Sequence, residues 1–182
     1  MNTNSNINYY RTDDIALAPY LAMKDLKYCV GELDNSGKVF FVFKDPENIG
    51  NELEFGFNSS ALFRYNILWK KFRGKLDKFE LENKKKDPNI NYYETDRLAL
   101  APYLVMRDLK YSHMEQLGRK KIFYFEDPLF IGQELLMDFE KSEETTYNKY
   151  WHIFRKEVEK TKSNVKLGLE DPIFLKNSRA QK

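Results

Sequence analysis

The chain has 182 residues, of which 42% are hydrophobic, 15% aromatic and 32% charged. This composition is too apolar for a disordered chain, and the length suffices for one domain or two small ones. Because the net charge is only +2, an overall electrostatic attraction to nucleic acid or membrane is excluded, and any such partner must be recognised by local clusters.

The single cysteine, Cys29, excludes an intramolecular disulfide, and the polar segment from Met1 to Asn8 lacks the apolar stretch of a signal peptide. No apolar run approaches the ~18 residues of a membrane span. These features predict a cytoplasmic protein without a membrane partner.

The segment from Ile7 to Tyr28 is repeated from Ile90 to Tyr111, with 17 of 22 positions identical. Self-similarity of this kind indicates a tandem duplication. We therefore expect an α+β fold of two tandem β-α-β-β-α units related by a pseudo-twofold, an internal pseudo-dimer. The expected boundaries are a leader (1–6), repeat unit 1 (7–81), a linker (82–89), repeat unit 2 (90–162) and a C-terminal tail (163–182).

In chain order, Tyr9 and Tyr10 predict a short extended segment. Thr12 or Asp13 then suits the N-cap of a helix that carries the apolar residues between positions 15 and 22. Pro19 is expected beyond the first turn of this helix, where it should kink the helix or split it. Pro102 repeats this feature in the second copy.

A hairpin follows, with strands at 27–33 and 38–43 around the turn residues 34–37. The second copy has the turn at 116–119 and a shorter strand at 122–125. Asp45-Pro46 and Asp127-Pro128 come next, and they are expected to cap and to begin a helix.

Two amphipathic helices are expected at the end of each copy. Ile49, Leu53 and Phe57, and their counterparts Ile131, Leu135 and Phe139, form the stripe of the first. The final helices carry Leu62, Tyr65, Trp69, Phe72, Leu76 and Phe79 in one copy and Tyr147, Trp151, Phe154 and Val158 in the other. Residues 169–174 resemble residues 125–130, which indicates either a docking segment or chance.

Catalytic motifs are weak. The glycines form no phosphate-binding loop, and Cys29, His113 and His152 lack ligand spacing, so we expect no cofactor, no metal and no catalytic residues. Cys29 is expected to be a core thiol and His113 a surface imidazole. Three pairs of repeated carboxylates could bind a hard metal ion in a nuclease-like site, but capping is the simpler interpretation: Asp13/Asp96, Asp45/Asp127 and Glu52/Glu134.

The final helices carry basic residues outside their apolar stripes, which predicts phosphate binding, with a solvated helix face as the alternative. The candidates are Lys70, Lys71, Arg73, Lys75 and Lys78 in one copy, and Lys149, Arg155, Lys156, Lys160 and Lys162 in the other. Tyrosines on the first strand of each copy could stack on bases, or could pack on their own helix: Tyr9, Tyr10, Tyr92 and Tyr93.

The signature from Tyr10 to Asp13, with Leu17-Ala18 and Leu21, followed by residues 39–46, resembles a family of short uncharacterised domains of bacteria, archaea and their phages. The resemblance implies a small protein of a phage or mobile element, and the family has no assigned activity that could be carried over to this chain. From the basic final helices and the tyrosines, we expect a non-enzymatic nucleic-acid-binding protein. The alternative is a protein-binding module, such as a phage-encoded inhibitor of a host defence complex, and a metal-dependent nuclease comes third.

Overall fold

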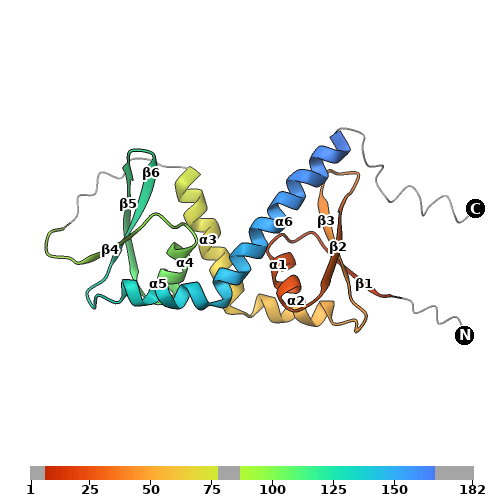
Figure 1. Cartoon of the computed structure of the whole chain (residues 1–182), viewed down its shortest axis with the longest axis horizontal. Coiled ribbons are helices and arrows are strands. Elements are labelled where there is room, and N and C mark those ends of the chain that lie inside the picture. The colour runs from red at the N-terminus through yellow and green to blue at the C-terminus, as the bar shows by residue number, and fades with distance from the viewer. Residues whose placement is uncertain (1–6, 78–86, 167–182) are drawn as a thin grey trace, which may run out of the picture. The chain divides into compact units, whose positions relative to one another are not determined.

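The computed structural model describes residues 7–77 and 87–166 and has a mixed α+β fold, as expected. Lys78, the leader, most of the linker and the tail from residue 167 lie outside the described residues. The elements, shown in Figure 1, are β1 (Tyr9–Thr12), α1 (Leu17–Met23), β2 (Lys27–Leu33), β3 (Val39–Lys44), α2 (Gly50–Asn58), α3 (Ala61–Asp77), β4 (Tyr92–Thr95), α4 (Leu100–Met106), β5 (Lys110–Leu117), β6 (Lys120–Glu126), α5 (Gly132–Lys141) and α6 (Glu143–Lys166).

The chain divides into two compact units that do not coincide with the sequence repeats. Among the described residues, unit 1 consists of residues 7–60 and 147–166, and unit 2 of residues 61–77 and 87–146. The final helix of each repeat therefore belongs to the unit built on the other repeat: α3 lies in unit 2, and α6 from Tyr147 onward lies in unit 1. We call this arrangement the helix exchange.

Each unit contains one three-stranded antiparallel sheet. The strand order is β1-β3-β2 in unit 1 and β4-β6-β5 in unit 2. The first hairpin turns at Asp34, whose side chain accepts hydrogen bonds from the backbone amides of Ser36 and Lys38, which confirms the predicted turn. The second turn is tighter than predicted, because β5 extends to Leu117 and β6 already begins at Lys120.

In unit 1, helices α1, α2 and α6 cover one face of the sheet (Figure 1). Phe154 of α6 packs edge-on against Tyr28 and Phe41, with ring centroids 5.1 and 5.2 Å apart. Tyr147 donates a buried hydrogen bond of 2.8 Å to the carbonyl oxygen of Ala16. Aromatic packing and this bond together hold α6 against the sheet and α1 of unit 1.

Unit 2 repeats the same contacts with α3. Phe72 packs edge-on against Tyr111 and Phe123, at 5.2 and 5.6 Å. Tyr65 donates a hydrogen bond of 2.7 Å to the carbonyl oxygen of Ala99. The apolar stripes predicted for the two final helices are confirmed over the described residues, since Tyr65, Trp69, Phe72, Tyr147, Trp151 and Phe154 are buried. Phe79, also predicted for the stripe of α3, lies outside the described residues.

The start of α1 differs from the prediction. The helix begins at Leu17, so Pro19 lies within the first turn. Backbone N–H groups there make no hydrogen bond within the helix, so a proline removes none. The N-cap residue is Ala16, without a side-chain cap, so the predicted caps Thr12 and Asp13 were wrong. Instead, the carboxylate of Asp14, three residues before the helix begins, accepts a hydrogen bond from the amide of Ala16.

Candidate nucleic-acid interface

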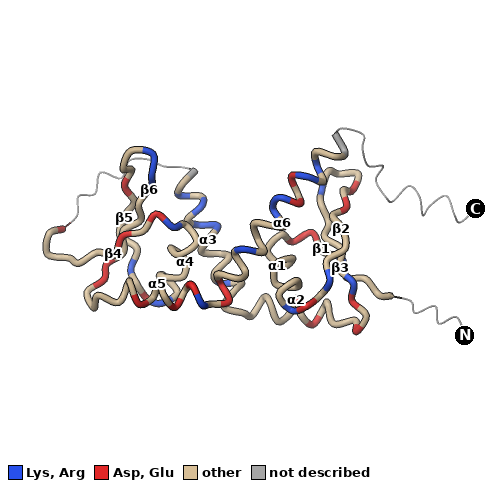
Figure 2. Tube along the Cα trace, in the orientation of Figure 1, with Lys and Arg blue, Asp and Glu red and all other residues tan. Residues whose placement is uncertain are grey.

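Helix α6 presents a basic stripe to solvent. Lys149, Lys156 and Lys160 are exposed and recur at steps of seven and four residues, which places them on one side of the helix, away from the buried Trp151 and Phe154. No described carboxylate forms an ion pair with these three lysines. Figure 2 shows basic positions recurring along α6 with acidic ones between them.

Arg155 of α6 is partly engaged, whereas Lys162 is exposed. The Arg155 guanidinium lies 5.5 Å from the ring centroid of Trp151 and 3.5 Å from the Glu159 carboxylate. Partial burial, and then the cations Arg155 and Lys156, lower the pKa of His152. Arg155 and Lys156 therefore act on His152 in the same direction as its partial burial, as neighbouring cations do.

Helix α3 carries Arg64, Lys70, Lys71, Arg73 and Lys75 against one acidic residue, Asp77. Lys70, Lys71 and Lys75 are exposed, whereas Arg73 is half-buried. The Lys75 ammonium lies 4.6 Å from the ring centroid of Tyr111, in a cation–π contact. We call Lys70, Lys71 and Lys75 the basic stripe of α3. It belongs to unit 2, and the basic stripe of α6 belongs to unit 1.

Alignment of the buried residues of α3 and α6 makes Arg73 and Arg155 equivalent, but Lys70 corresponds to His152 and Lys75 to Glu157. The two basic stripes are therefore not copies of one site.

The four candidate tyrosines differ in what covers their rings. Tyr9 is 57% exposed. Tyr10 donates a 2.6 Å hydrogen bond to Glu54, and burial followed by this bond raises its pKa. Tyr92 packs edge-on against His113, and Tyr93 lies over Gly132. Only Tyr9 presents most of its surface to solvent.

The repeated carboxylates make different kinds of contact in the structure. Asp45 and Asp127 are buried, and each accepts two backbone hydrogen bonds at the start of a helix. These bonds confirm the capping interpretation, but Pro46 and Pro128 do not begin the helices, since α2 begins at Gly50 and α5 at Gly132. Asp96 pairs with Lys120 at 2.9 Å, and the Lys120 ammonium lowers the pKa of Asp96.

Removal of one cap should destabilise the protein. In Asp127→Ala, the amides of Ile131 and Gly132 lose a buried carboxylate acceptor at 2.9 and 2.8 Å. We expect a loss of about 2–3 kcal/mol in the free energy of unfolding, measured by urea denaturation. Asp96→Ala, which removes an exposed ion pair, should change the free energy by less than about 1 kcal/mol. An equal effect of both variants would contradict the buried cap.

The predicted roles of Cys29 and His113 were wrong. Cys29 is exposed, at the bulge where β2 shifts register against β3. His113 is 1% exposed and stacks on Tyr124 at 4.6 Å, while its ring nitrogens contact Ser112 and Glu115. Strand β5 has a bulge at the same place. Because an inserted residue changes which side chains face inward, these bulges explain why the cysteine is exposed and the histidine buried, the reverse of the prediction.

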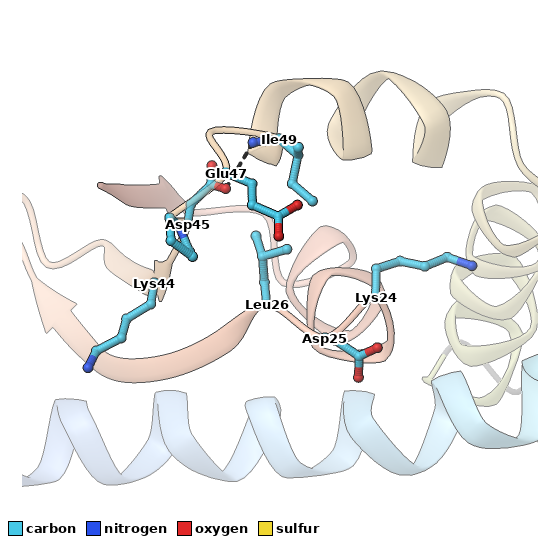
Figure 3. Close-up of a pocket in the computed structure, with 8 residues that line it drawn as sticks. Lys24, Asp25, Leu26, Lys44, Asp45, Glu47 and Ile49 are labelled. Atoms are coloured by element: carbon cyan, nitrogen blue, oxygen red, sulfur yellow. Dashed lines mark hydrogen bonds between the residues drawn. The ribbon is translucent and has the colours of Figure 1, made fainter. Parts of the chain in front are cut away.

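A pocket of about 240 Å³ lies in unit 1 between the loop after α1 and the loop after β3. In Figure 3 the ammonium groups of Lys24 and Lys44 point away from each other, and the Asp45 carboxylate is engaged with the amide of Ile49. No residue predicted from the sequence as phosphate- or base-binding lines this pocket. Among the described residues, no three or more His, Cys, Asp or Glu side chains are placed to hold a metal ion.

Sequence reasoning missed the basic residues of the sheet in unit 1, namely Arg11, Lys27 and Lys44. Strand register brings them to one face, opposite the helices. Their spacing in the chain carries no signal of this proximity; correct pairing of β1 and β2 with β3 would have revealed it.

Within the part of the chain that the structure describes, no helix is both long and apolar enough to cross a membrane. Comparison of the chain with protein-family models, with curated proteins and with solved structures found no match.

Proposed function

We propose that this chain is a non-enzymatic nucleic-acid-binding protein of a phage or mobile element, in which the basic stripes of α3 and α6 hold phosphates. The observation that supports it best is the stripe of Lys149, Lys156 and Lys160, whose ammonium groups face solvent without a described carboxylate partner. Ammonium groups in such an array release counterions from a polyanion on binding.

The proposal includes the origin of the chain by tandem duplication, with the copies related by a pseudo-twofold. The matching order of strands in the two sheets supports this origin. Duplication also accounts for the helix exchange, because both sheets then offer nearly the same aromatic surface to either final helix.

The test is a salt series of binding to single-stranded and duplex oligonucleotides. In the triple variant Lys149→Gln, Lys156→Gln and Lys160→Gln, we expect weaker binding at low salt and a shallower dependence of log K on log salt, by about one per lysine that contacts a phosphate. The matched control is the triple variant Lys24→Gln, Lys110→Gln and Lys120→Gln, which has the same net charge and should retain the wild-type slope.

His152 provides an independent measurement by NMR titration. A phosphate beside α6 offsets the cations that lower the pKa of His152, so this pKa should rise when an oligonucleotide binds. Equal slopes in the two triple variants, together with an unchanged pKa, would overturn the role of α6.

A second candidate is a protein-binding module that binds a host protein, as an inhibitor of a defence complex would. The exposed apolar residues Leu129, Phe130 and Met137 of unit 2 favour it, since they are 74%, 72% and 51% exposed. Absence of nucleic-acid binding at low salt would reject the first proposal. A host protein crosslinked through a photoreactive residue at position 130, but not at the exposed position 117, would then support the second.

A further inference from the structure

The sheet of unit 1 has one face that no described helix covers. Helices α1, α2 and α6 lie against the opposite face, which carries Phe41 and Phe43 (Figure 1). Directly paired residues of neighbouring strands project to the same side of a sheet. The register therefore assigns eight side chains to what we call the outer face: Tyr9, Arg11, Lys27, Val30, Glu32, Phe40, Val42 and Lys44.

One row of the outer face places two lysines in direct opposition. Lys44 of β3 pairs with Lys27 of β2 on one side and with Tyr9 of β1 on the other. Like charges directly across an antiparallel pair destabilise a sheet. An anion bound between these ammonium groups removes that cost.

Unit 2 has a different arrangement at the same register. Lys110 lies opposite Glu126, with which it forms an ion pair at 2.8 Å, and the residue on the other side is Tyr92. Glu94 occupies the position of Arg11. The corresponding face of unit 2 therefore has its lysine paired with a carboxylate and a glutamate in place of Arg11.

The next rows supply an aromatic surface and an arginine that is already paired with a carboxylate. The Arg11 guanidinium lies 3.8 Å from the ring centroid of Phe40 and 3.3 Å from the Glu32 carboxylate. These contacts fix the arginine before any ligand binds, which lowers the conformational entropy lost on binding. Tyr9, 57% exposed, lies two residues away on the same strand.

We propose that the outer face of unit 1 binds single-stranded nucleic acid, with a phosphate between Lys27 and Lys44 and a base stacked on Tyr9. Exposed aromatic rings on strands next to basic side chains suit single strands, whose bases are free to stack, whereas duplex bases are already stacked on each other. This inference rests on the proposed function and assigns its substrate class.

The test measures the affinity of the full chain for a short fluorescent oligothymidylate and for a duplex of equal length. Wild type should bind the single strand more tightly. Tyr9→Ala should weaken single-strand binding by about tenfold, as loss of one stacked base predicts, whereas Tyr9→Phe should retain the affinity. Tyr92→Ala, the matched change in unit 2, should leave single-strand binding unchanged.

Lys44→Glu separates loss of binding from loss of folding. It recreates in unit 1 the lysine–glutamate pair that unit 2 has at this register, so the thermal midpoint should stay the same or rise. Single-strand affinity should nevertheless fall by at least tenfold, because a carboxylate replaces a phosphate-binding ammonium.

Each outcome is decisive. If Tyr9→Ala and Lys44→Glu bind the single strand as wild type does, or if wild type prefers the duplex, the outer face is not the site. In that case weaker binding by the triple lysine variant of α6 would leave the proposed function intact. If wild type binds neither oligonucleotide at low salt, the proposed function and this inference fail together.

Discussion

Replacement of Phe154 by alanine is expected to destabilise the sheet of residues 9–44, although Phe154 lies more than a hundred positions away and in the second sequence repeat. Its ring is 3% exposed and packs against Tyr28, Phe41 and Phe43 of unit 1. Truncation of a buried phenylalanine costs about 3–5 kcal/mol, through lost burial and the cavity left behind.

The location of the effect distinguishes the helix exchange from a fold in which each repeat closes on itself. Amide hydrogen exchange should show reduced protection of Phe41 and Phe43 in Phe154→Ala, with protection of Phe123 and Phe125 nearly unchanged. The matched variant Phe72→Ala should show the reverse pattern, because Phe72 packs against Phe123 and Phe125. Reduced protection within the mutated repeat's own sheet would contradict the exchange.

Gly132→Ala is the second change with a large expected effect. A β-carbon at this position would lie 2.2 Å from Cδ2 and 2.3 Å from Cγ of Tyr93, which is far closer than atoms can approach. The start of α5 or the half-buried ring must move. We expect a loss of about 3 kcal/mol in the free energy of unfolding, measured by urea denaturation.

A double-mutant cycle identifies the cause. If the clash with the ring is responsible, Gly132→Ala should cost much less in a Tyr93→Ala background, and the two changes should not be additive. Gly74→Ala in α3 is the control, since a β-carbon there meets no atom within 4 Å and alanine favours helix. Full additivity of the cycle would reject ring packing as the reason for this glycine.

Local features of the fold followed from the sequence, because they depend on neighbouring residues. The turn at Asp34 and the buried stripe of α3 are examples, and the structure confirms both. An apolar stripe shows which side of a helix is buried, but it does not show which sheet buries it. Phe41 and Phe123 offer equivalent surfaces, so the partner of α6 was not predictable from the pattern.

For the same reason, only part of the candidate site could be predicted from the sequence. Exposed lysines at helical spacing identified the stripe of α6 before the structure did. The outer face required the register that pairs Lys27 with Lys44, and this depends on a bulge at Cys29 with no clear mark in the sequence. The bulge likewise decided the burial of His113, which sequence spacing alone placed at the surface.

The helix exchange also sets the order in which the protein can fold during synthesis. Unit 2 has all of its residues once the ribosome has added Thr146, whereas unit 1, whose strands are made first, lacks its α6 segment until later. Contacts between segments so distant in sequence form slowly. Until α6 has been made, the sheet of unit 1 therefore lacks the helix that covers Phe41 and Phe43, and apolar surface exposed in this way favours aggregation.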